Sequence, residues 1–130
     1  MNIGTAAKAA GLPIKTVRYY ADIGLVTPSG RTDSGYRRYT ETELSKLIFA
    51  RRSRSFGFTI DETRELLSLY EDQERSSADV RAIAAGRLEE IEAKMRELTA
   101  LRDELSHLVE ACCGDGRPDC PILLRIAEET

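Results

Sequence analysis

The chain has 130 residues, 42% of them hydrophobic and 32% charged, which suits one compact domain with an extension. It holds no apolar run long enough to span a bilayer and no basic segment followed by an apolar stretch at its N-terminus, so we expect no membrane partner, no signal peptide and a cytoplasmic location. The net charge of the whole chain is −3, but residues 1–60 are basic, with ten Lys/Arg against four Asp/Glu. A basic segment indicates a polyanionic partner such as nucleic acid, and the alternative is a basic surface that faces only solvent.

Two short helices are predicted in the first 24 residues. The segment IGTAAKAAGL is rich in alanine and ends at Gly11, a residue typical of helix C-termini. Pro13 suits the first turn of a second helix, IKTVRYYADIG, which closes at Gly24. Two short helices joined by a tight glycine-containing turn predict a helix-turn-helix.

The second of these helices has one apolar face and one basic, aromatic face. Ile14, Val17 and Ala21 share the inner face, and Tyr20 lies at its border. Arginine and lysine can reach phosphates or the guanine edge, and tyrosine can donate to phosphate. An ordinary amphipathic surface helix would look the same. The DNA-binding residues that we predict in this helix are Lys15, Arg18, Tyr19 and Tyr20.

A winged extension is predicted next, in the turn-rich segment TPSGRTDSGYRRYT at residues 27–40. Turn residues precede SGYRRY, whose alternating Tyr and Arg favour a short strand and so a small β-hairpin. A flexible loop is the alternative. The hairpin would place Arg31, Tyr36 and Arg37, with Arg38, beside the DNA backbone.

Two further helices are predicted between residues 40 and 70. Thr40 with Glu43, and Thr59 with Glu62, each form the sequence of a capping box. The first helix ends on three arginines, at positions 51, 52 and 54. The helix macrodipole alone favours one or two basic residues there, whereas three together suit phosphate contact, and we assign Arg54 to it.

One long helix is predicted over residues 78–111, after a polar linker at 71–77. Its apolar residues recur at steps of four and three, which indicates a coiled-coil seam, and its length would be roughly 50 Å. No other predicted element matches that length, so we expect it to pair with its copy in a homodimer, rather than fold back on its own domain. The dimer residues predicted along this seam are Leu88, Ile91, Met95, Leu98 and Leu105.

All three cysteines lie in the segment CCGDGRPDCP that follows this helix, at positions 112, 113 and 120. The spacing fits neither a C-x-x-C redox motif nor a paired zinc ribbon, and His107 is the chain's one histidine. Two thiolates on a closed loop suit a soft ion that accepts low coordination, above all Cu(I). A thiol pair that oxidises is the rival interpretation.

The motifs VRYY, IGLVTP, GYRRYT, RSFGFTIDE, SADV and C-x7-C-P-I together resemble the MerR family of transcriptional regulators, and within it the copper-responsive branch. The resemblance implies a mainly α fold: a winged helix-turn-helix domain (1–70), an antiparallel coiled-coil dimer helix and a C-terminal metal-binding loop with a short helix (112–130). It implies that Arg18, Tyr36 and Arg37 contact DNA, and that Cys112 and Cys120 bind one Cu(I), Ag(I) or Au(I) per subunit.

The resemblance also implies how such a regulator works. The dimer binds a palindromic promoter, and the metal-bound form distorts the DNA so that RNA polymerase can engage and transcribe copper efflux or detoxification genes. Ser77 stands where divalent-sensing relatives carry a cysteine, which favours a monovalent ion.

Two alternatives within the same fold stay open. Cys113 could act as a third ligand of a Zn(II) or Hg(II) sensor, or Cys112 and Cys120 could form a redox-responsive disulfide. We find no acid–base pair, nucleotide loop or catalytic triad, so we expect no enzyme.

Overall fold

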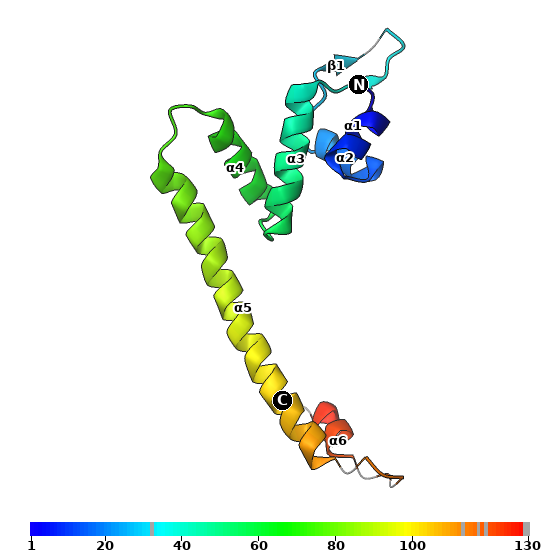
Figure 1. Cartoon of the computed structure of the whole chain (residues 1–130), viewed down its shortest axis with the longest axis vertical. Helices are drawn as coiled ribbons and strands as arrows, with labels where there is room; N and C mark the ends of the chain where they lie inside the picture. The colour runs from blue at the N-terminus through cyan, green and yellow to red at the C-terminus, as the bar shows by residue number, and fades with distance from the viewer. Residues whose placement is uncertain (32, 113, 117, 119, 129–130) are drawn as a thin grey trace. The chain divides into compact units, whose positions relative to one another are not determined.

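The computed structural model describes residues 1–31, 33–112, 114–116, 118 and 120–128. The chain divides into two compact units, Met1–Arg87 and Leu88–Thr130, and each is described by itself. The described helices and strands are shown in Figure 1. Cys113 lies outside the described residues, so the prediction that concerns it has no structural counterpart.

The first unit begins with the predicted helix pair, α1 (Ile3–Ala10) and α2 (Ile14–Asp22). The Asn2 side chain caps α1 by accepting from the Thr5 N–H at 2.8 Å. Gly11 ends the helix in the left-handed conformation, with φ of 72°, a geometry that glycine adopts without steric cost. Pro13 is the N-cap of α2, one position before the helical turn in which we expected it. The helix-turn-helix is confirmed.

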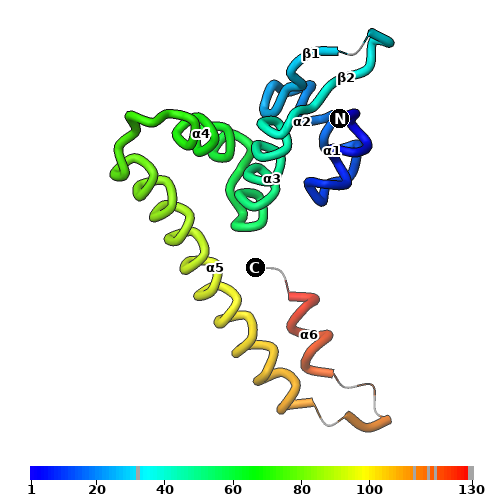
Figure 2. The backbone as a smooth tube through the Cα atoms, turned by 45° about the horizontal axis from the view of Figure 1, so that its top comes forward, coloured from blue at the N-terminus to red at the C-terminus, as the bar shows by residue number. Residues whose placement is uncertain are grey.

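The hairpin after α2 is also confirmed. Strands β1 (Gly30–Arg31) and β2 (Arg37–Arg38) pair antiparallel and lie side by side in Figure 2. Gly30 faces Arg38, and Arg31 faces Arg37. The hairpin therefore forms a short wing that follows the second helix of the helix-turn-helix.

Helices α3 (Glu41–Ser55) and α4 (Ile60–Glu71) complete this unit, and each starts with the predicted capping box. The backbone N–H of Thr40 donates to Glu43 Oε2 at 2.8 Å, and that of Thr59 donates to Glu62 Oε1 at 2.9 Å. The side chains thus satisfy backbone donors that a helix start leaves without partners.

A hydrophobic core holds these elements together. It takes residues from α1, α2, α3, α4 and the segments on either side of the wing, which fixes the orientation of α2 and the wing on a common support. Its buried members are Ala6, Ala7, Ala10, Val17, Tyr20, Leu25, Val26, Tyr39, Leu47, Ala50 and Leu67.

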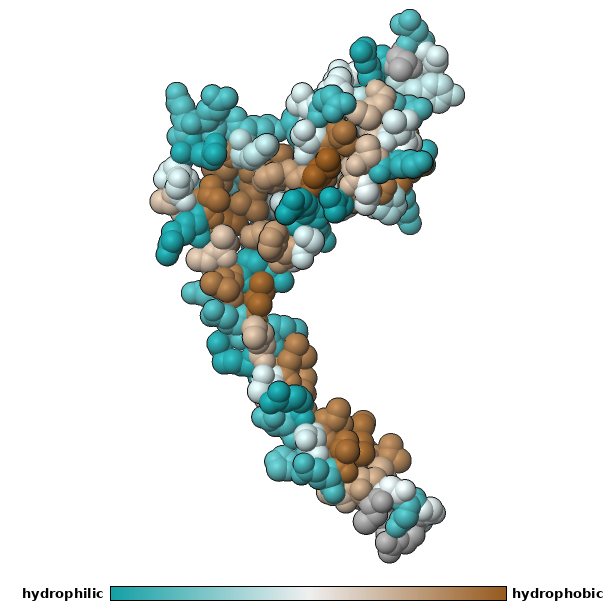
Figure 3. Space-filling model, in the orientation of Figure 1, coloured by the Kyte–Doolittle hydropathy of each residue, from teal (hydrophilic) through white to brown (hydrophobic). Residues whose placement is uncertain are grey.

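Two helices follow, α5 (Ser77–Ala111) and α6 (Pro121–Ala127), and neither has a buried residue among those described. Helix α5 starts one residue earlier than predicted. Figure 3 shows hydrophobic side chains at the surface along it, and the most exposed are Leu88, Met95, Leu98, Leu101, Leu105 and Val109. No helix in the described part of the chain is long and apolar enough to cross a membrane.

Candidate nucleic-acid interface and thiol loop

Helix α2 presents a basic and aromatic surface to solvent. Lys15, Arg18 and Tyr19 are exposed, as the sequence predicts. Tyr20 requires a correction, because only 5% of it is exposed and it packs in the core. It lies three residues after buried Val17 and therefore on the same helix face, so its side chain is not part of the exposed surface of α2.

The wing has an outer and an inner side. Tyr36 is 71% exposed, whereas Tyr39 is fully buried and the side chain of Arg37 is 30% exposed. Side chains alternate along extended chain, so Arg37 and Tyr39 share the inner side. Arg37 Nη2 donates to Asp22 Oδ1 at 3.2 Å, and this ion pair ties the wing to the end of α2.

Tyr39, two residues after Arg37, is fully buried. Burial raises the pKa of its phenol, and the positive charge of nearby Arg37 opposes that rise. Tyr39 therefore stays a neutral core residue, while Arg37 pairs with Asp22. The role of Arg37 as a DNA contact stays a prediction.

The structure brings Arg18 of α2 together with the predicted wing residues Arg31, Tyr36 and Arg37. These four side chains line a recess of about 230 Å³ at the N-terminus of α1, and Lys15 and Tyr19 are not among its lining residues. Arg31 Nη1 donates to the Gly35 carbonyl at 3.1 Å, which holds the arginine within the hairpin. Three arginines therefore line one recess, and Arg37 among them is also paired with Asp22. The residues that line it are Asn2, Ile3, Arg18, Arg31, Gly35, Tyr36 and Arg37.

Arg54 lies elsewhere, in the last turn of α3. Its side chain is exposed, but Nη1 donates to the carbonyl of Phe58 in the turn before α4. Arg51 and Arg52 are exposed beside it. Arg54 thus supports the α3–α4 turn, and its phosphate contact stays a prediction.

The thiols of Cys112 and Cys120 stand at the two ends of the loop between α5 and α6. Both are free and half-buried. The N–H of Cys112 donates to the Leu108 carbonyl at 3.1 Å, which fixes it to the last turn of α5, and Cys120 is the N-cap of α6. Each thiol is therefore attached to the end of a helix.

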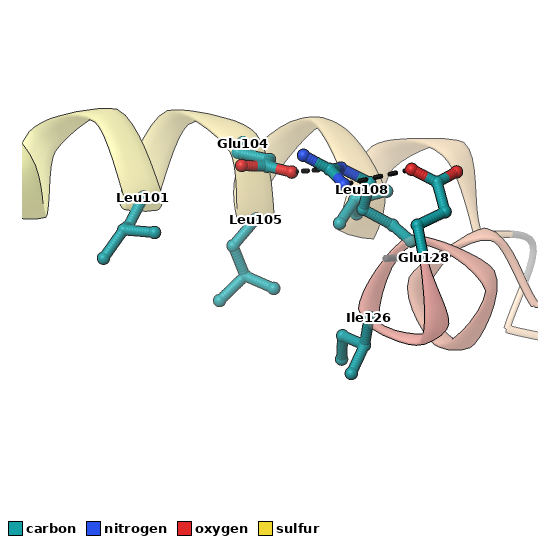
Figure 4. A pocket seen from close by; sticks show the side chains of 7 residues that line it. Leu101, Glu104, Leu105, Leu108, Ile126 and Glu128 are labelled. Atoms are coloured by element: carbon teal, nitrogen blue, oxygen red, sulfur yellow. Dashed lines mark hydrogen bonds and ion pairs between the residues drawn. The ribbon is translucent and has the colours of Figure 1, made fainter. Parts of the chain in front are cut away.

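Helix α6 is fastened to the end of α5 by charge. Arg125 Nε lies 2.5 Å from Glu104 Oε1 of α5, whereas the pair of Arg125 Nη1 with Glu128 Oε2, at 3.0 Å, lies within α6 and its C-cap. The carboxylates of Glu104 and Glu128 raise the pKa of Arg125. Figure 4 shows the two ion pairs beside a hydrophobic groove of about 390 Å³. Its apolar lining consists of Leu101, Leu105, Leu108 and Ile126.

The donor set of this loop fits a soft metal ion. Thiolate sulfur is the ligand that Cu(I) and related soft ions prefer. Among the described residues, no group of three or more His, Cys, Asp or Glu side chains is arranged to hold an ion. Ser77 is the first residue of α5, and it is exposed. Cys112 and Cys120 are the two cysteines in the described part of the chain, and their role as metal ligands stays a prediction.

Sequence reasoning missed three contacts that shape these sites. They involve Asp22 with Arg37, Glu104 with Arg125, and Arg87 with the Phe56 carbonyl. Residues at distant positions carry no pairing signal in a single sequence, whether they meet through opposite charges or through a backbone carbonyl. The missing signal is three-dimensional proximity, which only the fold supplies.

A family model described as MerR family regulatory protein matches residues 2–39, and one described as MerR, DNA binding matches residues 44–108. The HTH-type transcriptional regulator HmrR of Rhizobium leguminosarum bv. viciae is 56% identical over 128 residues, covering 98% of each chain. The HTH-type transcriptional regulator CueR of Salmonella typhimurium is 44% identical over 123 residues, covering 95% of this chain and 89% of that one.

A solved structure shows the same likeness in three dimensions. The transcription regulator PbrR691 from Ralstonia metallidurans CH34, in complex with lead(II), matches with a TM-score of 0.83 at 35% sequence identity. The match covers 98% of this chain and 99% of that chain.

Proposed function

This chain belongs to the MerR family as a metal-responsive transcriptional regulator, and from that premise we propose that it senses Cu(I), with Ag(I) and Au(I) as chemical equivalents. We place it in the cytoplasm as a homodimer on double-stranded promoter DNA. In this proposal the metal-bound dimer activates genes for copper efflux or detoxification.

The observation that carries the proposal is the pair of thiols at the ends of one short loop. Cys112 follows the last residue of α5, and Cys120 caps α6. A two-ligand, near-linear arrangement suits Cu(I), whereas Zn(II) prefers four ligands. Two thiolates leave a net charge of −1 with a monovalent ion and need no further anionic donor.

Ser77 supports the monovalent choice. In the proposed dimer, Ser77 of the partner subunit stands near the metal loop, where a divalent sensor would supply a third thiolate. A serine hydroxyl is a hard, neutral donor and a poor ligand for a soft ion. With serine instead of cysteine at position 77, the metal ion has no third thiolate there, which favours a two-coordinate monovalent ion.

The dimer itself is supported by the unpartnered seam of α5. Leu88, Met95, Leu98 and Leu105 are each more than half exposed, and Ile91 lies between them on the same helix. A helix with an apolar stripe of this length needs a partner to bury it. An antiparallel pairing with a second copy would bury both stripes and place each thiol loop near the partner's DNA-binding unit.

The basic surface of α2 and the wing supports the proposed role in transcription. Lys15, Arg18 and Tyr19 on α2 and the wing residues around Arg31 and Tyr36 provide donors for base edges and phosphates. In our proposal the apo and metal-bound dimers both bind the promoter. The metal changes the shape of the DNA, so RNA polymerase engages only the metal-bound complex.

The test is an anaerobic titration of the reduced protein with Cu(I) and with Zn(II), each against a strong competing chelator. We expect one Cu(I) per subunit and much weaker retention of Zn(II). The variants Cys112→Ser and Cys120→Ser should each lose Cu(I) and the transcriptional response, with promoter affinity nearly unchanged.

Cys113→Ser is the matched control, and it should respond almost normally. A Cys113→Ser protein that no longer responds would favour the divalent alternative, with a third sulfur ligand. A wild-type protein that responds to a thiol oxidant in the absence of metal would favour the redox alternative.

A further inference from the structure

The side chain of Arg87, in the N-terminal part of α5, contacts the turn between α3 and α4. Arg87 Nε donates to the backbone carbonyl of Phe56 at 2.8 Å. Phe56 is the C-cap of α3, and the last carbonyls of a helix lack partners inside the helix. A guanidinium at this end also interacts favourably with the helix dipole. Arg87 therefore acts as a C-terminal cap of α3 that is supplied by α5.

Gly57 makes room for this contact. A Cβ atom at position 57 would lie 2.0 Å from Arg87 Nη2 and 2.6 Å from Cζ, so the guanidinium packs directly against the glycine backbone. Gly57 also has a φ of 86°, a conformation that other residues rarely adopt. Residues 57 and 87 thus fit each other, although they are far apart in the sequence.

The turn that receives Arg87 is otherwise well fixed. Arg54 donates to the carbonyl of Phe58, the Gly57 N–H donates to the Arg54 carbonyl at 2.9 Å, and Thr59 caps α4. Phe58 is buried, with 9% of its surface exposed. The turn is therefore a firm attachment point, and it follows directly on the arginines at the end of α3.

We propose that Arg87 is the positioning residue that couples α5 to the DNA-binding unit, so that a change at the metal loop alters how that unit holds DNA. This inference rests on the proposed function, because coupling requires a metal signal and a DNA output. Arg87 lies far along the sequence from the thiols and on a different element from α2 and the wing. Its loss should leave metal binding and promoter binding in place and weaken the link between them.

The test compares Arg87→Met with Arg87→Lys. Methionine keeps an apolar stem of similar reach without charge or donor, whereas lysine keeps a donor for the Phe56 carbonyl. The measurement is the ratio of transcription in vitro with and without Cu(I), together with Cu(I) affinity, promoter Kd and thermal melting. For Arg87→Met we expect the ratio to fall about tenfold, within the usual range of coupling between sites, with both affinities changed less than about threefold. Arg87→Lys should keep most of the response.

Arg81→Met is the matched control, because it removes the same charge from an exposed position in the same part of α5. It should respond like the wild type. If Arg87→Met responds as fully as the wild type, or if it no longer shows a folded melting transition, the coupling role is overturned and the proposed function stands. A wild-type protein without any Cu(I) response overturns the proposed function and this inference with it.

Discussion

Residues 1–87 and residues 88–130 obtain their order from different sources. The first unit encloses a core of its own, in which Val17, Tyr39 and Leu47 are fully buried. The second unit has no buried residue among those described, and all its leucines but the half-buried Leu108 are exposed along α5 and α6. The first unit is thus stabilised by packing within one chain, whereas the second needs a partner to cover its apolar surface.

This difference assigns different tasks to the two units. A unit with its own core can hold α2 and the wing in fixed positions whether or not metal is present. A unit that depends on outside contacts can change its arrangement when a ligand adds or removes a few interactions. The thiol loop lies in the second unit, where such a change costs least.

The largest expected effect concerns the core of the first unit. Leu47→Ala should lower the free energy of unfolding by about 2–5 kcal/mol, because Leu47 is fully buried in α3. Denaturant unfolding should show this loss at every protein concentration. Ser45→Ala, on the exposed side of the same helix, should stay within about 0.5 kcal/mol of the wild type. Equal losses in both variants would contradict the core that we describe.

The second prediction concerns the seam of α5. Leu98→Asp should raise the dimer dissociation constant at least about a hundredfold, because it places two charges in an apolar interface. Sedimentation should show the wild type as a dimer at micromolar concentration and the variant as a monomer. Glu97→Ala, an exposed neighbour, is the control and should remain dimeric. A monomeric wild type would refute the need for a partner.

The third prediction tests whether the surface of the first unit works independently of the metal. Arg18→Ala should cost about 1–3 kcal/mol of promoter binding and relax base preference, by the same factor with and without Cu(I). Arg54→Ala should weaken binding to all sequences alike and lower the salt slope by about one. Titrations of promoter DNA and of DNA with altered bases, over a series of salt concentrations, would measure the affinity, the base preference and the salt slope of each variant. Equal changes in the two variants would contradict the assignment of Arg18 to bases and Arg54 to phosphates.

The smallest effect concerns the cap of α3 and its pH dependence. Burial of Glu43 raises its pKa, but hydrogen bonds from the Thr40 hydroxyl and backbone outweigh it and leave the pKa lowered. The contribution of Glu43 to folding stability is therefore complete above the pKa that its carboxyl has in the unfolded chain, about 4.3. It is lost as the pH falls through the lower pKa of the folded protein. Glu43→Gln keeps a side chain that can cap α3 but has no carboxyl group to protonate. The free energy of unfolding of this variant should therefore fall less than that of the wild type as the pH is lowered from 5. Denaturant unfolding over a pH series measures this, and an equal loss of stability below pH 5 in both proteins would contradict the prediction.

The sequence predicted the parts of the fold that depend on local interactions. The stop at Gly11, both capping boxes and the wing follow from residues a few positions apart, and all are confirmed. The resemblance to the MerR family and the expectation that the chain is no enzyme are confirmed by its relatives, which are transcriptional regulators.

The sequence failed where three-dimensional packing decides. Tyr20 looked like a border residue of α2, but the rotation of the helix on the core buries it. The side of the wing on which Arg37 lies, and its pairing with Asp22, depend on how the hairpin meets α2. The contact of Arg87 with Phe56 joins residues that no local pattern connects.

In our proposal Cys112 and Cys120 hold Cu(I) without a third protein sulfur. Copper K-edge X-ray absorption on the anaerobically loaded dimer measures the number of sulfur neighbours directly. We expect two sulfurs per copper in the wild type and the same spectrum in Cys113→Ser, because neither requires Cys113. A shell of three sulfurs in the wild type that drops to two in Cys113→Ser would contradict the claim.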